Sequence, residues 1–523
     1  MTKSLVEMDG RTYDVVVIGA GVNGSSAAQQ LAAGGYRVLL VDKGDFAAGS
    51  SARSSRLLHC GLRYLAPGQS AWEFARHPRQ FLTACKMARQ AMESRAQFVK
   101  TTAERIRRMT FHFPIYDDSP YEGWQVDAAF ALLRVLGTGG VPLDYRRMNA
   151  ETVRETPLID QLRSMDELKG VSGFREYLFD WPERLVIDNV LDAERMGADV
   201  CNYTAVTELE YEDETWHLRL TDMDDGSGQA VTVSTKAIFN MAGIWIDRVN
   251  RNSRQGRPKR KITGTKGTHI AVRLPPECEG QGVATLNRQS EPFYCVPWRG
   301  LHYFGPTETL YEDELNCIEP TLDEVDWLLD EANYLFPGLK LDRSDVRYAW
   351  SGVRPLTYDP ERPMGARDRK LHDLTEDGLP NVFAMTAGPV MTHRSAGTEV
   401  RSALAKRLRP SGPPQALSYA SPAFPGDPES PLVVDGPHPI CEADVVRAVR
   451  YEHARTLVDV LFRRTGAAWS EGMAADQAPR VAELMAGHLG WSDEETARQL
   501  ATYRRYLKSQ FLFEAPVSTP VES

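Results

Sequence analysis

Long apolar runs, paired cysteines and a net positive charge are all missing from this chain. Because no run of about 18 apolar residues occurs, no membrane-spanning helix is expected. The N-terminal stretch MTKSLVEMDGR has no apolar core, so no secretory signal peptide is expected. The net charge of −10 argues against nucleic acid as a general partner. An anionic substrate would therefore need a local basic pocket.

The cysteine pattern indicates a reducing compartment. The seven cysteines are scattered, odd in number and form no CxxC pair. This pattern argues against a disulfide framework and against a zinc site. We therefore expect no metal, and we expect a cytoplasmic location. The 523 residues are too many for one hydrophobic core, so two or three domains are expected.

The segment from Thr12 to Asp42 predicts a strand–turn–helix–strand unit. Tyr13–Ile18 is a short apolar run that suits a buried strand, and the glycine turn GAGVNG follows directly. A small-residue helix over 25–33 and a second apolar strand over 37–41 complete the unit. This context favours dinucleotide binding over the alternative, a glycine-rich turn of another α/β unit.

Each glycine of this turn has a predicted task. Gly19 forms the tight turn, Gly21 lets a pyrophosphate approach the backbone, and Gly24 lets the helix pack close to the strand. Asp42 lies 18 residues after Gly24. At that spacing a carboxylate can bind ribose hydroxyls.

Later segments complete this picture. Residues 43–65 form a Gly/Ser-rich loop with basic residues, which suits phosphate and flavin contacts better than a plain solvated loop. Runs over 205–214 and 216–223 predict a hairpin. A second strand–turn–helix over 381–408 suggests that the chain returns to complete the cofactor site. Residues 409–440 hold nine of the 32 prolines and predict a linker or wrapping segment.

Several motifs together carry a resemblance to a known family. They are DVVVIGAGVNGSSAA, SSARSSRLLHCGLRYL, FNMAGIWID, TKGTHIAV, YAWSGVRPL, NVFAMTAGPVMTHR and VRYEHARTLVDVLFRRTG. In this order, over nearly the whole chain, they resemble the FAD-dependent glycerol-3-phosphate dehydrogenase family of D-amino-acid-oxidase-like flavoproteins.

The resemblance implies an α/β fold, α+β overall. A Rossmann-like FAD domain would combine with an antiparallel-sheet substrate domain and a C-terminal helical domain. The expected ranges are 1–75, 180–262 and 355–408 for the FAD domain, 76–179 and 263–354 for the substrate domain, 409–440 for the linker and 441–523 for the helical domain.

The resemblance also implies which residues bind FAD. The expected set is Gly19, Gly21, Asn23, Gly24, Asp42, Ser51, Ser54, Ser55, Arg56, Gly243, Gly388 and Thr392.

Family positions that face the substrate supply the other candidates. His269 is the first candidate for the base that accepts the hydroxyl proton, and His59 is the reserve. A buried core histidine is the plain alternative for His269. Arg354 cannot deprotonate, so it would hold the developing oxyanion or the phosphate. Expected substrate-binding residues are Arg63, Tyr64, Lys266 and Arg394.

The chain departs from the family pattern near the substrate. Pro389 stands where the family carries a lysine that reaches the substrate phosphate, and Cys60 replaces a glycine. Without the lysine, binding of the substrate phosphate would lose a charged hydrogen bond of about 1.5–3 kcal/mol unless Arg394 or His393 substitutes. The departures suggest a different substrate within the class, such as the larger polyol phosphate erythritol phosphate. The alternative, sn-glycerol 3-phosphate itself, stays open.

The expected reaction is hydride transfer from a secondary alcohol to flavin N5, with the electrons passed on to quinone. Two alternatives stay open: an amine or amino-acid oxidase in which Arg354 grips a carboxylate, and a flavin-binding protein without turnover. Peripheral membrane association rests on the basic run 251–261 and the apolar segment 127–136. The sequence favours the plainer interpretation of each, a solvated loop for 251–261 and a core helix for 127–136. A homodimer is left open.

Overall fold

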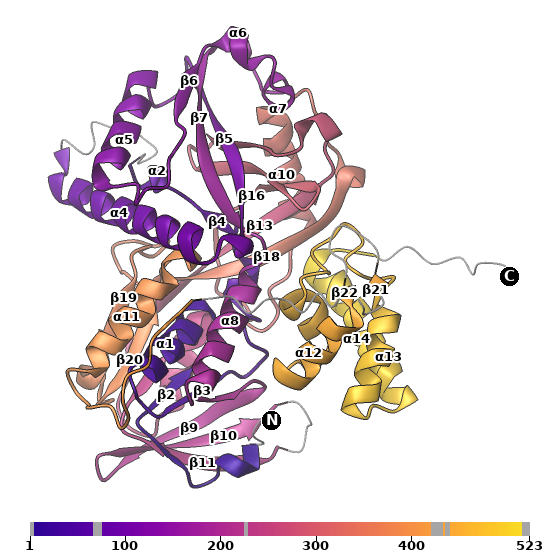
Figure 1. The fold of residues 1–523 in the computed structure, drawn as a ribbon. Helices are drawn as coiled ribbons and strands as arrows, with labels where there is room; N and C mark the ends of the chain where they lie inside the picture. The colour runs from indigo at the N-terminus through magenta and orange to yellow at the C-terminus, as the bar shows by residue number, and fades with distance from the viewer. Residues whose placement is uncertain (1–4, 66–75, 224–227, 420–431, 435–439, 515–523) are drawn as a thin grey trace, which may run out of the picture.

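The computed structural model describes residues 5–65, 76–223, 228–419, 432–434 and 440–514. Within these ranges, no helix combines the length and the apolar character that a bilayer-spanning segment needs. Two large sheets, a smaller four-stranded sheet and a helical unit at their side make up most of the described structure (Figure 1). The mixed α/β fold expected from the sequence is confirmed.

The first sheet has six strands in the order β19-β20-β12-β2-β3-β8. Neighbours from β20 to β8 are parallel, and β19 is an antiparallel edge strand. The strands are β2 (Val15–Ile18), β3 (Val38–Val41), β8 (Asp199–Cys201), β12 (Ile238–Asn240), β19 (Lys370–Asp373) and β20 (Val382–Thr386). The late strand β12 lies beside β2, and β20 lies beside β12, as expected for a chain that returns to its first domain.

Helices and a second small sheet cover the two faces of this sheet. The helices α1 (Val22–Ala33), α8 (Pro182–Arg195) and α11 (His393–Leu404) pack together on one face. The other face packs against a four-stranded sheet of β1 (Thr12–Tyr13), β9 (Thr204–Glu212), β10 (Thr215–Asp222) and β11 (Ala230–Thr235). The predicted hairpin is the antiparallel pair β9–β10.

The second large sheet has ten strands, eight of them in the order β17-β13-β16-β15-β14-β5-β7-β4, with β18 paired to β13 and β6 to β7. Its long strands β13 (Ile262–Val272) and β18 (Val346–Thr357) are antiparallel. The remaining strands are β4 (Leu57–Leu58), β5 (Ile106–Tyr116), β6 (Arg146–Met148), β7 (Leu168–Phe179), β14 (Gln281–Leu286), β15 (Pro292–Trp298), β16 (Leu301–Gly305) and β17 (Thr309–Leu310).

Strands of this sheet cross the expected domain boundaries. β4 lies in the ten-stranded sheet although residues 1–75 were expected in the FAD domain, and β18 continues past residue 354. The helix α10 covers Leu322–Leu335 and packs against β13. Pro320 precedes it, and Thr321 with Glu324 forms a capping box that fixes the start.

The C-terminal helical domain lies beside α8 and the end of β18 (Figure 1). It contains α12 (Glu442–Tyr451), the π-helical segment η9 (Asp459–Arg464), α13 (Ala478–Leu489) and α14 (Asp493–Phe511). Within the proline-rich segment, residues 409–419 run without helix or strand along the turn after α1, where Gly412 N donates to Gly35 O. Most of the remainder of 409–440 lies outside the described residues.

Candidate active site

A cavity of about 530 Å³ reaches from the end of β2 to the paired strands β13 and β18. This volume is typical of cofactor and small-molecule sites. Fifteen of the nineteen expected site residues line it: Gly19, Gly21, Asn23, Asp42, Ser51, Ser54, Ser55, Arg56, His59, Arg63, Tyr64, Gly243, His269, Arg354 and Gly388. The expected residues outside the lining are Gly24, Lys266, Thr392 and Arg394.

The glycine turn leaves an open cradle at one end of the cavity. Gly19 has φ of +101°, and a Cβ there would lie 2.7 Å from Met241 O. A Cβ on Gly24 would collide with Gly19 O, so Gly24 serves the close packing of α1 and not the lining itself. Gly21, Val22 and Asn23 line the cavity, so the start of α1 faces it, and a helix N-terminus suits a pyrophosphate.

Asp42 follows β3 and closes the nucleotide end. Its Oδ2 accepts a hydrogen bond from Ala20 N at 2.7 Å, and its Oδ1 accepts one from Gly44 N at 2.9 Å. Ser51 Oγ accepts from Val22 N at 2.9 Å, which ties the loop after β3 to the first turn of α1. These hydrogen bonds therefore fix both side chains at the cavity wall.

The loop from Ser54 to Arg56 lies further along the cavity. Arg56 has φ of +57°, and its guanidinium donates to Ser54 O at 3.0 Å. Gly243 after β12 and Gly388 after β20 line the wall in the left-handed region, with φ of +57° and +91°. Thr392 instead donates to Pro389 O at 3.0 Å, just before α11.

The far end of the cavity is built by one face of β13 and β18. The two strands pair Gly267 with Gly352 and His269 with Trp350. A Cβ on Gly267 would collide with the guanidinium of Arg354, and one on Gly352 would lie 2.5 Å from Arg53 Cβ. The glycine pair therefore leaves the room in which the two arginines lie.

Arginine side chains gather at this end. Arg63, Arg354 and Arg367 all line the cavity, and Arg367 is paired with Glu308. Burial lowers the pKa of Arg354 to about 10, with Arg367 and Arg63 adding repulsion. Arg354 Nη1 is buried and has no hydrogen-bond partner among the described residues. Such a cluster is suited to an anion that supplies the missing acceptors.

His269 lies beside this cluster with both ring nitrogens free of hydrogen-bond partners within the described part of the chain. Its ring stacks on Trp350 at 4.9 Å and meets the edge of Tyr303 at 5.6 Å. Burial, with the nearby charges of Arg354 and Arg56, holds the pKa of His269 well below its usual value. The imidazole is therefore neutral at pH 7 and able to accept a proton.

His59 is less free than His269. Its Nδ1 accepts from Gly61 N at 3.1 Å, and its ring meets the edge of Tyr64 at 5.2 Å. Burial lowers the pKa of His59 to about 3, with Arg63 adding to the shift. The free nitrogens of His269 make it the better placed base.

The structure places Lys266 and Arg394 away from the cavity. Lys266 Nζ forms an ion pair with Glu324 at 2.8 Å. Since strand residues alternate between faces, Lys266 and His269 cannot point the same way along a regular strand, and the sequence spacing already contained this signal. Arg394 lies between the rings of Phe98 and Tyr419, at 4.2 and 4.1 Å.

The expected substitutes for the family lysine are therefore absent from the cavity. Arg394 donates to the hydroxyls of Thr101 and Thr102, and His393 is buried with its Nδ1 2.7 Å from Val390 O. Sequence reasoning missed Arg367 as the additional cation, because it occurs in a charged stretch, ERPMGARDRK, that resembles a solvated loop. Its ion pair with Glu308 becomes visible only in the fold.

Comparison with known proteins identifies the fold family. The family described as FAD dependent oxidoreductase matches residues 14–394, and the C-terminal domain of alpha-glycerophosphate oxidase matches residues 421–496. The chain belongs to the FAD-dependent oxidoreductase family. This family membership confirms FAD as the expected cofactor.

Individual relatives are similar over most of the chain. A glycerol-3-phosphate dehydrogenase of Synechocystis sp. is 29% identical and is matched over 97% of this chain and 98% of its own length. An aerobic glycerol-3-phosphate dehydrogenase of Staphylococcus haemolyticus is 27% identical over 76% of this chain and 68% of its own. The glycerol-3-phosphate dehydrogenase of Bacillus halodurans, solved with FAD, has a TM-score of 0.71 at 21% identity, covering 96% of each chain.

The residues present fit FAD. Gly19 and Gly21, the carboxylate of Asp42 and the start of α1 line one end of the cavity together and suit the ADP half. The loop Ser54–Arg56 and the turn at Gly388 would then face the flavin, and the arginine cluster with His269 would lie beyond it.

Proposed function

We propose that this protein is an FAD-dependent dehydrogenase that oxidises the secondary alcohol of a phosphorylated polyol, with sn-glycerol 3-phosphate and erythritol phosphate as the two candidate substrates. One observation carries the proposal: a neutral, unpaired histidine and three arginines share the end of a cavity whose other end is a dinucleotide turn. The named relatives, which are glycerol-3-phosphate dehydrogenases, support the same chemistry.

Each side chain has a distinct task in this reaction. When bound, FAD supplies the hydride acceptor at flavin N5. His269 takes the hydroxyl proton at a free ring nitrogen, and Arg354 stabilises the oxyanion that develops on the alcohol oxygen. Arg63 and Arg367 bind the phosphate through their planar guanidinium groups.

The choice between the two substrates depends on Pro389. Pro389 lines the cavity and offers no donor, so the phosphate is held by the arginines alone. A proline also leaves space that a lysine side chain would fill. This combination favours a longer phosphorylated chain over a three-carbon one.

The test is anaerobic reduction of the bound flavin, measured as the loss of its visible absorbance. sn-Glycerol 3-phosphate, both enantiomers of erythritol phosphate, and unphosphorylated glycerol would be compared. Reduction by a polyol phosphate but not by glycerol supports the proposal. Reduction by an amino acid, with peroxide formed in air, would favour an amino-acid oxidase, and a flavin that none of these compounds reduces would favour a protein without turnover.

We further propose that the electrons pass to quinone at an anionic membrane surface, to which α5 (Gly123–Leu136) attaches the protein. α5 buries Val126, Phe130 and Leu133, but it also exposes an apolar stripe at helical spacing: Trp124, Ala128, Ala131 and Val135. The exposed fractions of Trp124 and Val135 are 59% and 83%.

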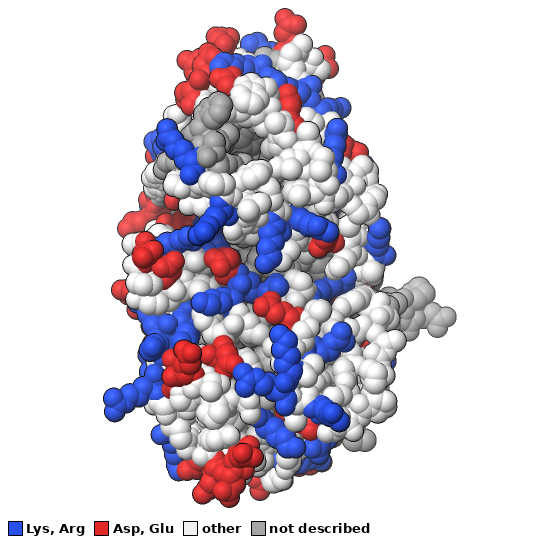
Figure 2. Space-filling view, turned by 90° about the vertical axis from the view of Figure 1, so that its left-hand side faces the viewer, with Lys and Arg blue, Asp and Glu red and all other residues white. Residues whose placement is uncertain are grey.

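Basic side chains accompany this stripe. Exposed Arg79 and Lys86 lie on the adjacent α4 (Pro78–Thr101), and Arg134 is exposed on α5 itself. Figure 2 shows the corresponding side of the molecule, where Lys and Arg side chains are interspersed with Asp and Glu side chains and uncharged surface lies between them. An apolar helix face with basic neighbours suits the interface of an anionic bilayer.

Sedimentation with vesicles tests this attachment. Wild-type protein should sediment with vesicles that contain anionic lipid, and a Trp124→Ala, Val135→Ser variant should stay in the supernatant. Tyr451→Ser is the control, because Tyr451 is 68% exposed on the C-terminal domain. Equal sedimentation of all three proteins would rule out α5 as the attachment site.

A further inference from the structure

The loop that lines the cavity after β3 is held from outside by the C-terminal helical domain. Ten residues between Lys43 and Arg56 line the cavity. Three charged side chains of this loop, Asp45, Arg53 and Arg56, contact the C-terminal domain, and each does so through a different element. These contacts fall within twelve consecutive residues.

The first contact is a buried ion-pair cluster. Asp45 is 1% exposed and accepts hydrogen bonds from Arg464 at 2.7 and 2.8 Å. Arg463 donates to the same carboxylate, and so does Asn202 at 2.9 Å. The two arginines, both on η9, hold the pKa of Asp45 well below its usual range although burial opposes this. The nucleotide end of the loop is thus fixed to η9.

The second contact lies at the middle of the loop. Arg53 lines the cavity, and its Nη2 donates to Tyr506 Oη at 2.8 Å. Its guanidinium also lies 4.5 Å from the ring centre of Phe511. Tyr506 and Phe511 belong to α14, so the last helix of the chain contacts a residue of the cavity wall.

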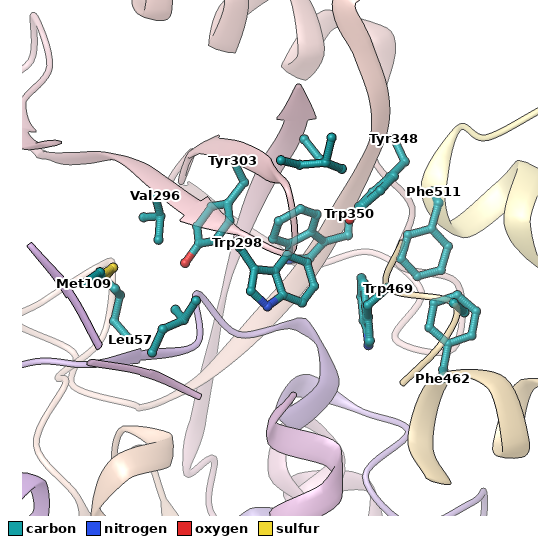
Figure 3. Packing of buried hydrophobic residues seen from close by; sticks show 14 of the residues in the cluster. Leu57, Met109, Val296, Trp298, Tyr303, Tyr348, Trp350, Phe462, Trp469 and Phe511 are labelled. Carbon is teal, nitrogen blue, oxygen red and sulfur yellow. The ribbon is translucent and has the colours of Figure 1, made fainter. Parts of the chain in front are cut away.

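The third contact is an aromatic box around Arg56. Its guanidinium is 4.2 Å from the ring centres of both Trp298 and Trp469, and 5.0 Å from that of Trp350. Trp469 comes from the C-terminal domain and donates to the buried Glu183 at 2.9 Å. Figure 3 shows the three indole rings close together, with Phe462 and Phe511 on the side of the C-terminal domain.

We propose that the C-terminal helical domain is a working part of the FAD site, in which Phe511 and Tyr506 position Arg53 and thereby the loop that faces the cofactor. The charges of Asp45 and Arg56 are buried, so separating the C-terminal domain from the loop would leave these charges without their partners, which is unfavourable. Docking of the domain and the conformation of the loop are therefore coupled. By linkage, FAD affinity must then depend on the domain contacts. This inference does not depend on the identity of the substrate.

The test is FAD binding to the apoprotein of the full chain, measured by the quenching of flavin fluorescence. Loss of the Arg53 cation–π contact in Phe511→Ala should raise the Kd for FAD about two- to thirtyfold. Tyr506→Phe, a milder change, should raise it in the same direction. Tyr503→Phe is the matched control, because the Tyr503 hydroxyl donates a hydrogen bond within the C-terminal domain, to Met473 O at 2.6 Å. The Kd of this variant for FAD should stay within twofold of the wild-type value.

A second control separates positioning from stability. Met485→Ala creates a cavity in the core of the C-terminal domain, on α13, and should lower the unfolding midpoint without changing the Kd for FAD. Combining Arg53→Met with Phe511→Ala should weaken FAD binding no more than Arg53→Met alone.

Two outcomes would overturn the inference. In one, Phe511→Ala and Tyr506→Phe lower the unfolding midpoint but leave the Kd of the folded protein within twofold of wild type. In the other, the Arg53 and Phe511 effects on Kd are fully additive. Neither outcome involves a substrate, so the proposed dehydrogenase activity is tested independently of this inference.

Discussion

Gly267→Ala should slow the proposed reaction without disturbing the fold. The left-handed region is not involved at Gly267, so alanine can adopt the backbone conformation of β13 without strain. The new Cβ, however, would occupy the place of the Arg354 guanidinium, whose Nη1 would lie only 2.8 Å away. Because the guanidinium is the end of a long side chain, it moves aside, and the strand does not have to.

The size of the effect follows from what Arg354 is proposed to do. A hydrogen bond to a charged group is worth about 1.5–3 kcal/mol. Displacing the guanidinium should therefore lower kcat/KM roughly ten- to 150-fold in anaerobic flavin reduction with sn-glycerol 3-phosphate or erythritol phosphate. The unfolding free energy should change by less than about 1 kcal/mol, since glycine in a strand has no stability advantage over alanine. Flavin content should match wild type.

Arg354→Met and the double variant complete the experiment. If Gly267→Ala acts only by displacing Arg354, the double variant should be no slower than Arg354→Met alone. The reasoning would be refuted by a Gly267→Ala enzyme that keeps kcat/KM within threefold of wild type. It would also be refuted by one that loses its flavin, because the steric conflict is confined to the far end of the cavity.

Three other outcomes are expected. Since the pKa of His269 is well below 6.5, the acid limb of the kcat/KM profile should lie below pH 6.5, and activity should be lost as the pH falls through that pKa. Arg354→Met should move this limb to higher pH, because it removes a positive charge near His269. An acid limb above pH 7 in the wild-type enzyme would contradict the prediction. Glu452→Gln should destabilise the protein by about 3 kcal/mol in urea unfolding, because it breaks a buried pair with Arg184 at 2.8 and 3.0 Å, and a loss below 1 kcal/mol would argue against a role in stability. Pro389→Lys should lower the KM for sn-glycerol 3-phosphate relative to erythritol phosphate, and an unchanged ratio would show that this position does not select the substrate.

The dinucleotide unit could be predicted from the sequence because local patterns encode it. An apolar strand, a glycine turn, a small-residue helix and an acid at fixed spacing leave little freedom, and β2, α1 and β3 follow that order. The hairpin β9–β10 was predictable for the same reason. The substrate end was not, because it is formed by pairing β13 with β18, about 80 residues later in the chain. Within a single strand, alternation separates Lys266 from His269, and motif matching alone overlooked it.

Arg394 and Arg367 illustrate the same limit. Arg394 stands in a motif, but its side chain lies between two aromatic rings contributed by Phe98 and Tyr419. Arg367 stands in no recognised motif, yet the return of the chain to β20 brings it to the cavity. A side chain's destination depends on distant segments that pack around it, which neither periodicity nor spacing encodes.

Two arginines near the proposed base also set its proton affinity. His269 has no carboxylate partner among the described residues, so its neutrality comes from burial and from the charges of Arg354 and Arg56. A bound phosphate dianion would offset part of that positive charge. The proton affinity of His269 would then rise only when substrate is present, and the acid limb of kcat should lie at higher pH than that of kcat/KM. In this arrangement the substrate's own charge strengthens the base that acts on it.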